Sequence, residues 1–150
     1  MQNKHTALRA LLWIICVYHI AFGLLANLPS ETVRNLAHAL FGLNLPEVSA
    51  LEYVLKPFGI YVMTFGVMMG VAAWNPVKNR ALISVGVVLF GLRILQRLIS
   101  MAAMEHALSI TPARNLGTLA VVAAFGLALA WLRLQLYREM HAPGTPEAAS

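Results

Sequence analysis

Charged residues are scarce in this chain. Asp, Glu, Lys and Arg together make up 11% of its 150 residues, whereas hydrophobic residues make up 59%. A soluble domain carries about 25% charged residues. The chain therefore lacks the charge needed to coat a water-facing surface, and this excludes an ordinary soluble domain.

Cysteine is nearly absent too. The single cysteine, Cys16, lies inside an apolar run, so no intrachain disulfide can form and we expect a small packing residue there. The sequence also lacks a Gly-rich phosphate loop, H-E-x-x-H, G-x-S-x-G and C-x-x-C. Only one of the five histidines, His19, falls inside a long apolar run, which argues against a haem held by paired histidines. His38 and His106 share the predicted outer side, but without a supporting motif we expect no metal, no cofactor and no enzyme.

What the chain does have is four long apolar runs. Residues 10–28 and 57–74 carry no formal charge, 80–105 begins with pure hydrocarbon, and 115–132 is again uncharged. Each approaches the roughly 20 residues that span a bilayer core. A cleaved signal peptide is the alternative for the first run, but we favour an anchor because the run is too long and ends without a clear cleavage site.

A shorter amphipathic segment separates the first two runs. Pro29-Ser30-Glu31 predicts a helix start with Ser30 as N-cap, and apolar residues recur at helical spacing at Val33, Leu36, Ala37 and Leu40. Gly42, Asn44 and Pro46 should end it. This predicts a short helix lying at the membrane interface.

The fold class predicted is therefore all-α. We expect an integral membrane four-helix bundle, up-down-up-down, with a short interfacial helix between spans 1 and 2. Residues 1–141 form a single four-span domain and 142–150 a disordered tail.

Basic residues set the orientation. With both termini in the cytoplasm, the inner flanks hold six basic residues and the outer loops two, as the positive-inside rule requires; the inner six are Lys4, Arg9, Lys78, Arg80, Arg133 and Arg138, and the outer two are Arg34 and Arg114. The net charge of +5 is thus explained by membrane orientation, and we expect no nucleic acid partner.

The third run carries two arginines on one face, Arg93 and Arg97. An arginine at the bilayer centre costs about 2.5–3.5 kcal/mol on insertion scales, so both should face the other helices. Counting about 1.5 Å per residue along each span places Arg93 level with His19 and Tyr61. The same count places Arg97, Lys56 and Glu52 in a second polar layer above the first. The predicted site is a polar cavity open to the outer face, lined by His19, Tyr61, Arg93, Gln96, Arg97, Glu52 and Lys56.

Two interpretations of this cavity remain open. It can bind an amphipathic or anionic ligand, such as a lipid headgroup, a quinone or a small aromatic compound, with the Met-rich run 62–70 beside the apolar part. Alternatively, the arginines pair with Glu52, Gln96 and backbone carbonyls and only lock the bundle. The leading functional hypothesis is an accessory ligand-binding protein; the alternative is a structural or assembly subunit of a membrane redox or transport complex.

Small-residue seams suggest where helices dock. Gly66-x-x-x-Gly70 is a close-packing motif, and Ala120, Ala124 and Ala128 form a second seam. Through them we expect contacts within the bundle, in a homo-oligomer or in a larger membrane complex.

Residues 74–97, WNPVKNRALISVGVVLFGLRILQR, resemble the region between the second and third spans of small bacterial four-helix membrane proteins of the DoxX-like and BphX-like sort. There an aromatic or small residue, a polar-Pro-x-basic turn and an apolar span ending in arginine recur. The resemblance implies a bacterial inner-membrane protein from a group associated with redox or aromatic-compound metabolism. It transfers no site residue.

Overall fold

The structure is a computed structural model that describes residues 5–42, 45, 49–108 and 111–141. Side chains are not described at Phe41, Met104, Leu108 and 49–52. Every regular element in the described ranges is a helix: α1 (Thr6–Ala26), α2 (Ser30–Phe41), α3 (Ser49–Trp74), α4 (Arg80–Ile99), α5 (Met101–Leu108) and α6 (Pro112–Met140). The predicted tail, 142–150, lies outside the described residues.

Four of these helices are long and apolar enough to cross a membrane. They are α1, the Tyr53–Trp74 part of α3, α4 and α6. The all-helical prediction and the four apolar runs are therefore confirmed.

The short helix α2 follows the predicted pattern. It ends at Gly42, whose φ of 65° lies in the left-handed region where glycine meets no steric penalty. Its start differs by one residue, since Pro29 is the N-cap and Ser30 is already helical, without a side-chain cap hydrogen bond. Proline suits the N-cap because its missing N–H is not needed at a helix start.

The third run is not one continuous helix, which corrects the expectation for residues 80–105. α4 ends at Ile99, Ser100 forms a turn, and the short helix α5 follows. The next helix begins as predicted, with Thr111 as N-cap and Pro112 in the first turn.

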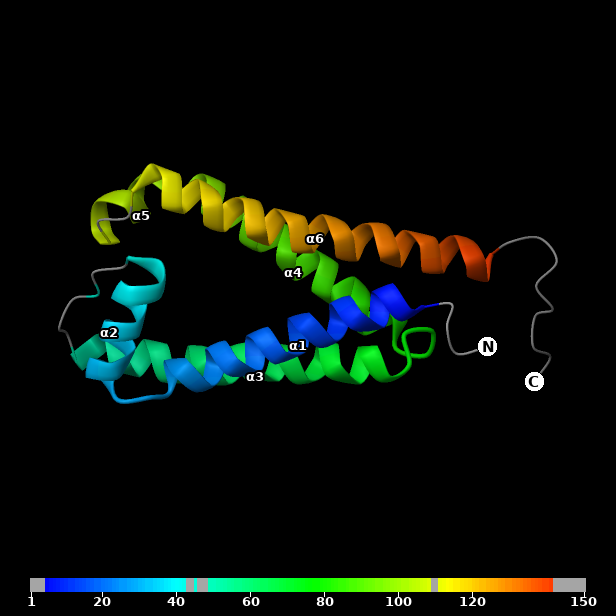
Figure 1. The fold of residues 1–150 in the computed structure, drawn as a ribbon, viewed down its shortest axis with the longest axis horizontal. Coiled ribbons are helices and arrows are strands. Elements are labelled where there is room, and N and C mark those ends of the chain that lie inside the picture. Colours follow the sequence, from blue (N-terminus) through cyan, green and yellow to red (C-terminus); the bar gives the residue numbers. More distant parts are fainter. Residues whose placement is uncertain (1–4, 43–44, 46–48, 109–110, 142–150) are drawn as a thin grey trace.

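The four long helices form two pairs that meet at one end and diverge at the other (Figure 1). α1 packs along α3, and α4 packs along α6. Both termini lie at the end where the pairs meet, which we call the narrow end, and α2 and α5 lie at the opposite, wide end. Successive long helices run in alternating directions.

Glycines bring α1 and α3 together. A Cβ at Gly66 would lie 3.0 Å from the backbone oxygen of Cys16, and one at Gly59 would lie 2.8 Å from that of Gly23. Gly70 meets the Cys16 sulfur in the same way. The Gly66/Gly70 motif therefore serves a contact within the chain, and Cys16 is buried in it as a packing residue.

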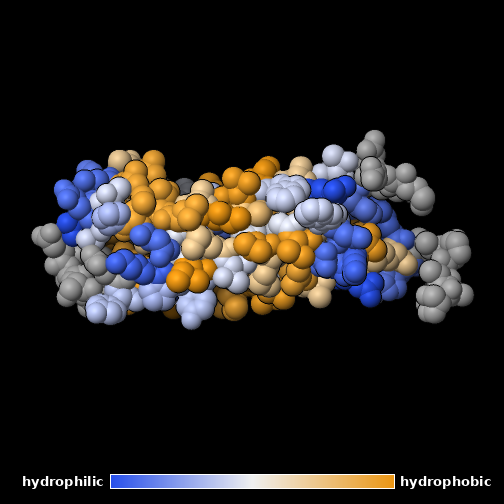
Figure 2. Space-filling model, turned by 90° about the horizontal axis from the view of Figure 1, so that it is seen from below, coloured by the Kyte–Doolittle hydropathy of each residue, from blue (hydrophilic) through white to orange (hydrophobic). Residues whose placement is uncertain are grey.

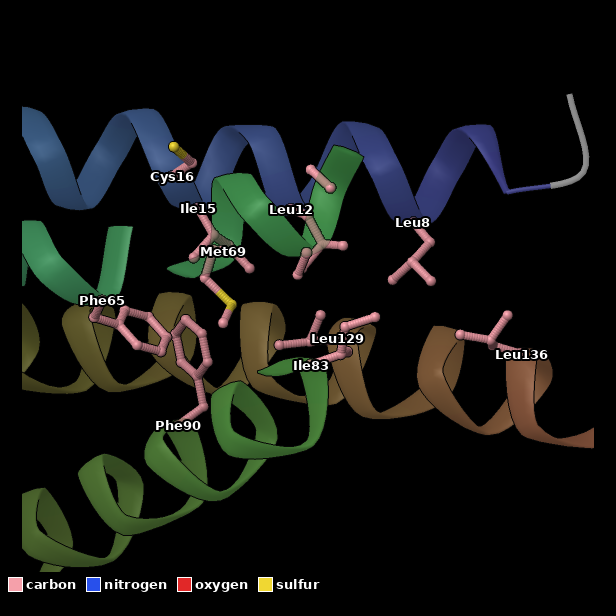
Figure 3. Close-up of a cluster of buried hydrophobic side chains, with 12 residues drawn as sticks. Leu8, Leu12, Ile15, Cys16, Phe65, Met69, Ile83, Phe90, Leu129 and Leu136 are labelled. Atoms are coloured by element: carbon pink, nitrogen blue, oxygen red, sulfur yellow. The ribbon is translucent and has the colours of Figure 1, made fainter. Parts of the chain in front are cut away.

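The apolar core fills the narrow end (Figure 3). All four long helices contribute to it: Leu8, Leu12 and Ile15 from α1, Phe65 and Met69 from α3, Ile83 and Phe90 from α4, and Leu129 and Leu136 from α6. Two hydrogen bonds at this end lie within the pairs, from Arg9 Nε on α1 to the Ala73 carbonyl on α3 at 3.0 Å and from Arg133 Nε on α6 to Ser84 Oγ on α4 at 3.2 Å, so the contact between the pairs is the apolar core. The two pairs are thus held together at the narrow end and separate toward the wide end.

Candidate functional site

A cavity of about 490 Å³ lies between the two helix pairs. Five of the seven predicted site residues line it, namely His19, Tyr61, Arg93, Gln96 and Arg97, together with the apolar side chains of Phe58, Val62, Phe65, Leu89 and Val122. The polar groups come from α1, α3 and α4. The cavity therefore brings two guanidinium groups, an amide and a phenol next to a largely hydrocarbon wall.

Arg93 and His19 make direct contact across the two pairs. His19 is 3% exposed, and its Nδ1 lies 2.7 Å from the Ile15 carbonyl oxygen. A carbonyl oxygen only accepts, so Nδ1 carries the proton. Nε2 of the neutral ring is then free to accept a hydrogen bond from Arg93 Nη1, at 3.4 Å. His19 thus holds the arginine toward the other helices, as expected for a guanidinium in an apolar helix.

Three rings pack together beside the cavity, and two of them, His19 and Phe65, line it. The His19 ring meets those of Phe65 and Phe90 edge-on, with centroids 4.8 and 6.1 Å apart, and the two phenylalanines are 6.3 Å from each other. Edge-to-face packing at these separations is favourable. Phe65 and Phe90 belong to the apolar core, so these contacts join the His19 ring to the core and fix the ring that receives Arg93.

Arg97 is positioned by a residue that the sequence did not single out. It donates from Nε to Oδ1 of Asn115, at 2.9 Å. Asn115 is fully buried on α6 and donates from Nδ2 to Glu105 Oε1, at 3.3 Å, and toward the Met101 carbonyl, at 3.5 Å. One amide therefore links α4, α5 and α6. Its signal in the sequence was only a polar residue at the start of an apolar run.

The cavity is electropositive. Among the described side chains, no carboxylate reaches ion-pair distance of Arg93 or Arg97; the ion pair between His5 and Glu139 lies at the narrow end. Glu105 approaches Arg97 only through the Asn115 amide. Two positive charges thus face a cavity whose described walls offer hydrogen-bonding groups and hydrocarbon.

The remaining two predicted residues are not placed in the cavity. Lys56 is exposed and does not line it, because it lies seven and fourteen residues before Met63 and Gly70 and so shares the glycine stripe of α3. The lining face of α3 instead follows Phe58, Tyr61 and Phe65. Glu52 belongs to α3, but its side chain lies outside the described residues.

Two smaller cavities adjoin the large one. A cavity of about 40 Å³ lies on the α1–α6 side and shares His19, Arg93 and Val122 with it. An apolar cavity of about 140 Å³ lies between α1, α2 and α3 and shares Phe58. Within the described part of the chain, no three His, Cys, Asp or Glu side chains gather as metal ligands would.

No protein-family model, curated protein or solved structure matches this chain. Its function is therefore inferred from the geometry and chemistry of the cavity.

Proposed function

We propose that this chain is a four-span bacterial inner-membrane protein, with both termini in the cytoplasm, that binds an anionic amphipathic ligand in the cavity between its helix pairs. The described lining of the large cavity contains binding groups but no nucleophile–base pair, so the proposed role is accessory rather than catalytic. The wide end is then the outer end.

Surface chemistry supports the membrane part of this proposal. Large apolar side chains are exposed along the long helices, among them Trp13, Ile14, Val88, Leu127 and Trp131. Figure 2 shows apolar side chains across the middle of one face, with hydrophilic ones gathered toward its two ends. Such a girdle is costly in water and is what a bilayer requires.

The two arginines carry the ligand-binding part. A guanidinium held in an apolar environment is stable when an anion or several acceptors satisfy it. Arg93 has one neutral acceptor in His19, and Arg97 has one in Asn115. Each retains further N–H donors, and an anionic headgroup between them would accept those hydrogen bonds while its apolar part packed on Phe58, Val62 and Leu89.

Native mass spectrometry after purification in a mild detergent tests this directly. We expect a co-purifying anionic amphiphile on the wild type, and loss of most of it in Arg93→Gln, since a charge-assisted hydrogen bond is worth about 1.5–3 kcal/mol. Arg138→Gln is the matched control, because Arg138 is an exposed arginine near the opposite end of the molecule. Equal ligand retention in Arg93→Gln and the wild type, with only a lower folding yield, would favour arginines that merely lock the helices.

A second function, as a subunit of a membrane redox or transport complex, is favoured by one observation. Ala120 and Ala124 are exposed on α6, whereas the glycine seam of α3 is already covered by α1. Small residues on an exposed transmembrane face allow close helix approach. The same mass spectra distinguish this role, which predicts a stoichiometric protein partner or a second copy that Ala124→Leu removes.

A further inference from the structure

We propose that the ligand is a single-headed lipid anion that enters the cavity sideways from the bilayer, through the opening between α3 and α4. This inference rests on the proposed function and narrows it: a carboxylate or phosphate headgroup lies at Arg93 and Arg97, while the hydrocarbon chain leaves toward the membrane. Free anions from the water would not be the natural ligand.

Both ends of the space between the helix pairs are obstructed. At the narrow end the apolar core, to which all four long helices contribute, fills it. At the wide end α2 reaches across from the α1–α3 pair, and the guanidinium of Arg114 on α6 packs against Gly42. The buried Asn115 amide ties α5 to α4 and α6 at the same end. These contacts disfavour a route along the long axis.

The sides of this space are less obstructed. The large cavity is lined mostly by α3 and α4, and its side chains include the exposed Tyr61 and Gln96. The small cavity opposite is lined by α1 and α6 around the exposed Tyr18 and Val121. His19 and Arg93 line both cavities, so their hydrogen bond lies between the large cavity and the small one.

The α3–α4 opening lies at the level of the membrane core. Its α3 residues, from Phe58 to Phe65, fall inside the apolar segment Tyr53–Trp74, and its α4 residues begin at Leu89, in the middle of α4. A lateral opening at this height faces acyl chains rather than water. An amphiphile dissolved in the bilayer can therefore reach the arginines without leaving hydrocarbon.

The lining residues divide by chemistry in a way that matches such a ligand. Gln96 and Arg97 lie one turn beyond Arg93 on α4, and all three line the cavity, where they can donate to one headgroup. Val62 on α3 and Leu89 on α4 are half-buried apolar residues of the cavity lining, one from each helix that flanks the proposed opening. A headgroup held by α4 would place the start of its chain between these two side chains.

Photo-crosslinking in lipid nanodiscs tests the route. Two probes carry a diazirine in the acyl chain, one a long-chain fatty acid and the other a long-chain lysophosphatidic acid, and so separate carboxylate from phosphate. We expect adducts of at least one probe on residues around Val62 and Leu89. Unlabelled probe should compete, whereas inorganic phosphate and acetate at the same concentration should not.

Matched tryptophan substitutions test which opening is used. Val62→Trp should lower adduct yield by about tenfold, because the larger side chain would fill the space that the acyl chain needs. Val121→Trp makes the same change at the α1–α6 side and should leave the yield unchanged. Leu89→Trp serves as a second obstruction if Val62→Trp fails to fold.

The crosslinking results distinguish the ways in which the proposal can fail. Adducts that persist in Arg93→Gln overturn the proposed function itself. Two results would overturn the lateral route but not the binding site. In the first, the adducts depend on Arg93 but map under α2, around Leu36 and Leu40. In the second, the adducts persist in both Val62→Trp and Leu89→Trp. Competition by inorganic phosphate or acetate would instead identify a soluble anion as the ligand.

Discussion

Hydrogen-bond directions decide what His19 does. Its Nδ1 donates to a carbonyl and its Nε2 accepts from a guanidinium, so a neutral ring with one tautomer satisfies both neighbours. Any residue without an acceptor at that height leaves Arg93 with an unmet donor between the helix pairs.

Replacing His19 with phenylalanine should therefore destabilise the fold although an aromatic ring remains at this position. We expect the free energy of unfolding to fall by about 0.5–1.5 kcal/mol, the net contribution of a typical hydrogen bond, since Arg93 is itself exposed. Chemical unfolding in detergent micelles, followed by circular dichroism, measures it. Tyr18→Phe is the neighbouring control and should change little; equal effects of the two substitutions would contradict the role given to the imidazole.

Asn115 is the second residue with a positioning role. Asn115→Ala removes the acceptor of Arg97 Nε and the donor to Glu105. We expect a loss of about 1–3 kcal/mol in stability and weaker retention of an anionic ligand, read by native mass spectrometry. Thr118→Ala, one turn further on α6 and bonded to the local Arg114 carbonyl, should alter neither; unchanged ligand retention in Asn115→Ala would show that Arg97 needs no positioning.

Counting residues along the spans was enough to predict which polar groups share a level. His19, Tyr61 and Arg93 were expected in one layer, and the structure brings them to one cavity. Asn115 was not predicted, because a lone amide at a helix start is ordinary in sequence and only its burial by α4 and α5 reveals the link. Lys56 was expected in the cavity because it shares the glycine stripe of its helix, but that stripe packs against α1 and the cavity lies on another face of α3.

At the scale of elements, the close approach of α1 and α3 depends on glycines, which have no side chain. A Cβ at Gly66 would lie 2.9 Å from Ile20 Cγ1 and 3.0 Å from the Cys16 oxygen, whereas a Cβ at Gly91 on α4 would meet nothing within 4 Å. Gly66 and Gly91 therefore form a matched pair of test sites, because both lie inside long helices but only Gly66 is tightly packed.

Gly66→Ala should lower stability and Gly91→Ala should not. The first forces the helices apart, at a cost of about 1–3 kcal/mol, while the second removes backbone freedom at a helical site and should be neutral or stabilising by about 0.5–1 kcal/mol. Thermal unfolding in the same detergent compares them. Equal shifts in Tm would mean that the α1–α3 contact is not what holds this pair.

Most helix boundaries followed from local chemistry, and one did not. Gly42 ends α2 and Pro112 starts α6 because of backbone preferences that a sequence displays. α3 runs through Pro57, which is the first residue of the uncharged run 57–74. The break at Ser100 has no glycine or proline; there the Met101 carbonyl meets Asn115 of α6, a contact between distant residues.

At the scale of the whole molecule, the divergence of the two pairs was not predictable from hydropathy. Apolar runs specify how many helices cross a membrane, but not which of them pack closely. That choice follows from where the glycines lie, since they let α1 and α3 approach closely, and from the core residues that join the two pairs only toward the narrow end. A bundle packed evenly along its length would have left no space beside Arg93.

Orientation can be tested on the intact chain. In a Cys16→Ala background, a single cysteine at Thr111 should react with a membrane-impermeant maleimide in intact bacterial cells. One at Arg138 should react only after permeabilisation, because the excess of basic residues holds that side in the cytoplasm. The opposite labelling pattern would invert the topology, and labelling of both sites in intact cells would contradict four spans.

The most direct test of the binding site is charge discrimination by the reconstituted protein. Affinities are measured in nanodiscs for a lipid anion and its neutral analogue of equal chain length, such as a fatty acid and its methyl ester. We predict that the wild type prefers the anion by at least about tenfold, and that Arg93→Gln/Arg97→Gln abolishes this preference while still binding the neutral analogue weakly. Equal binding of both ligands by the wild type, or a preference that survives the double substitution, would contradict an anion site at these two arginines.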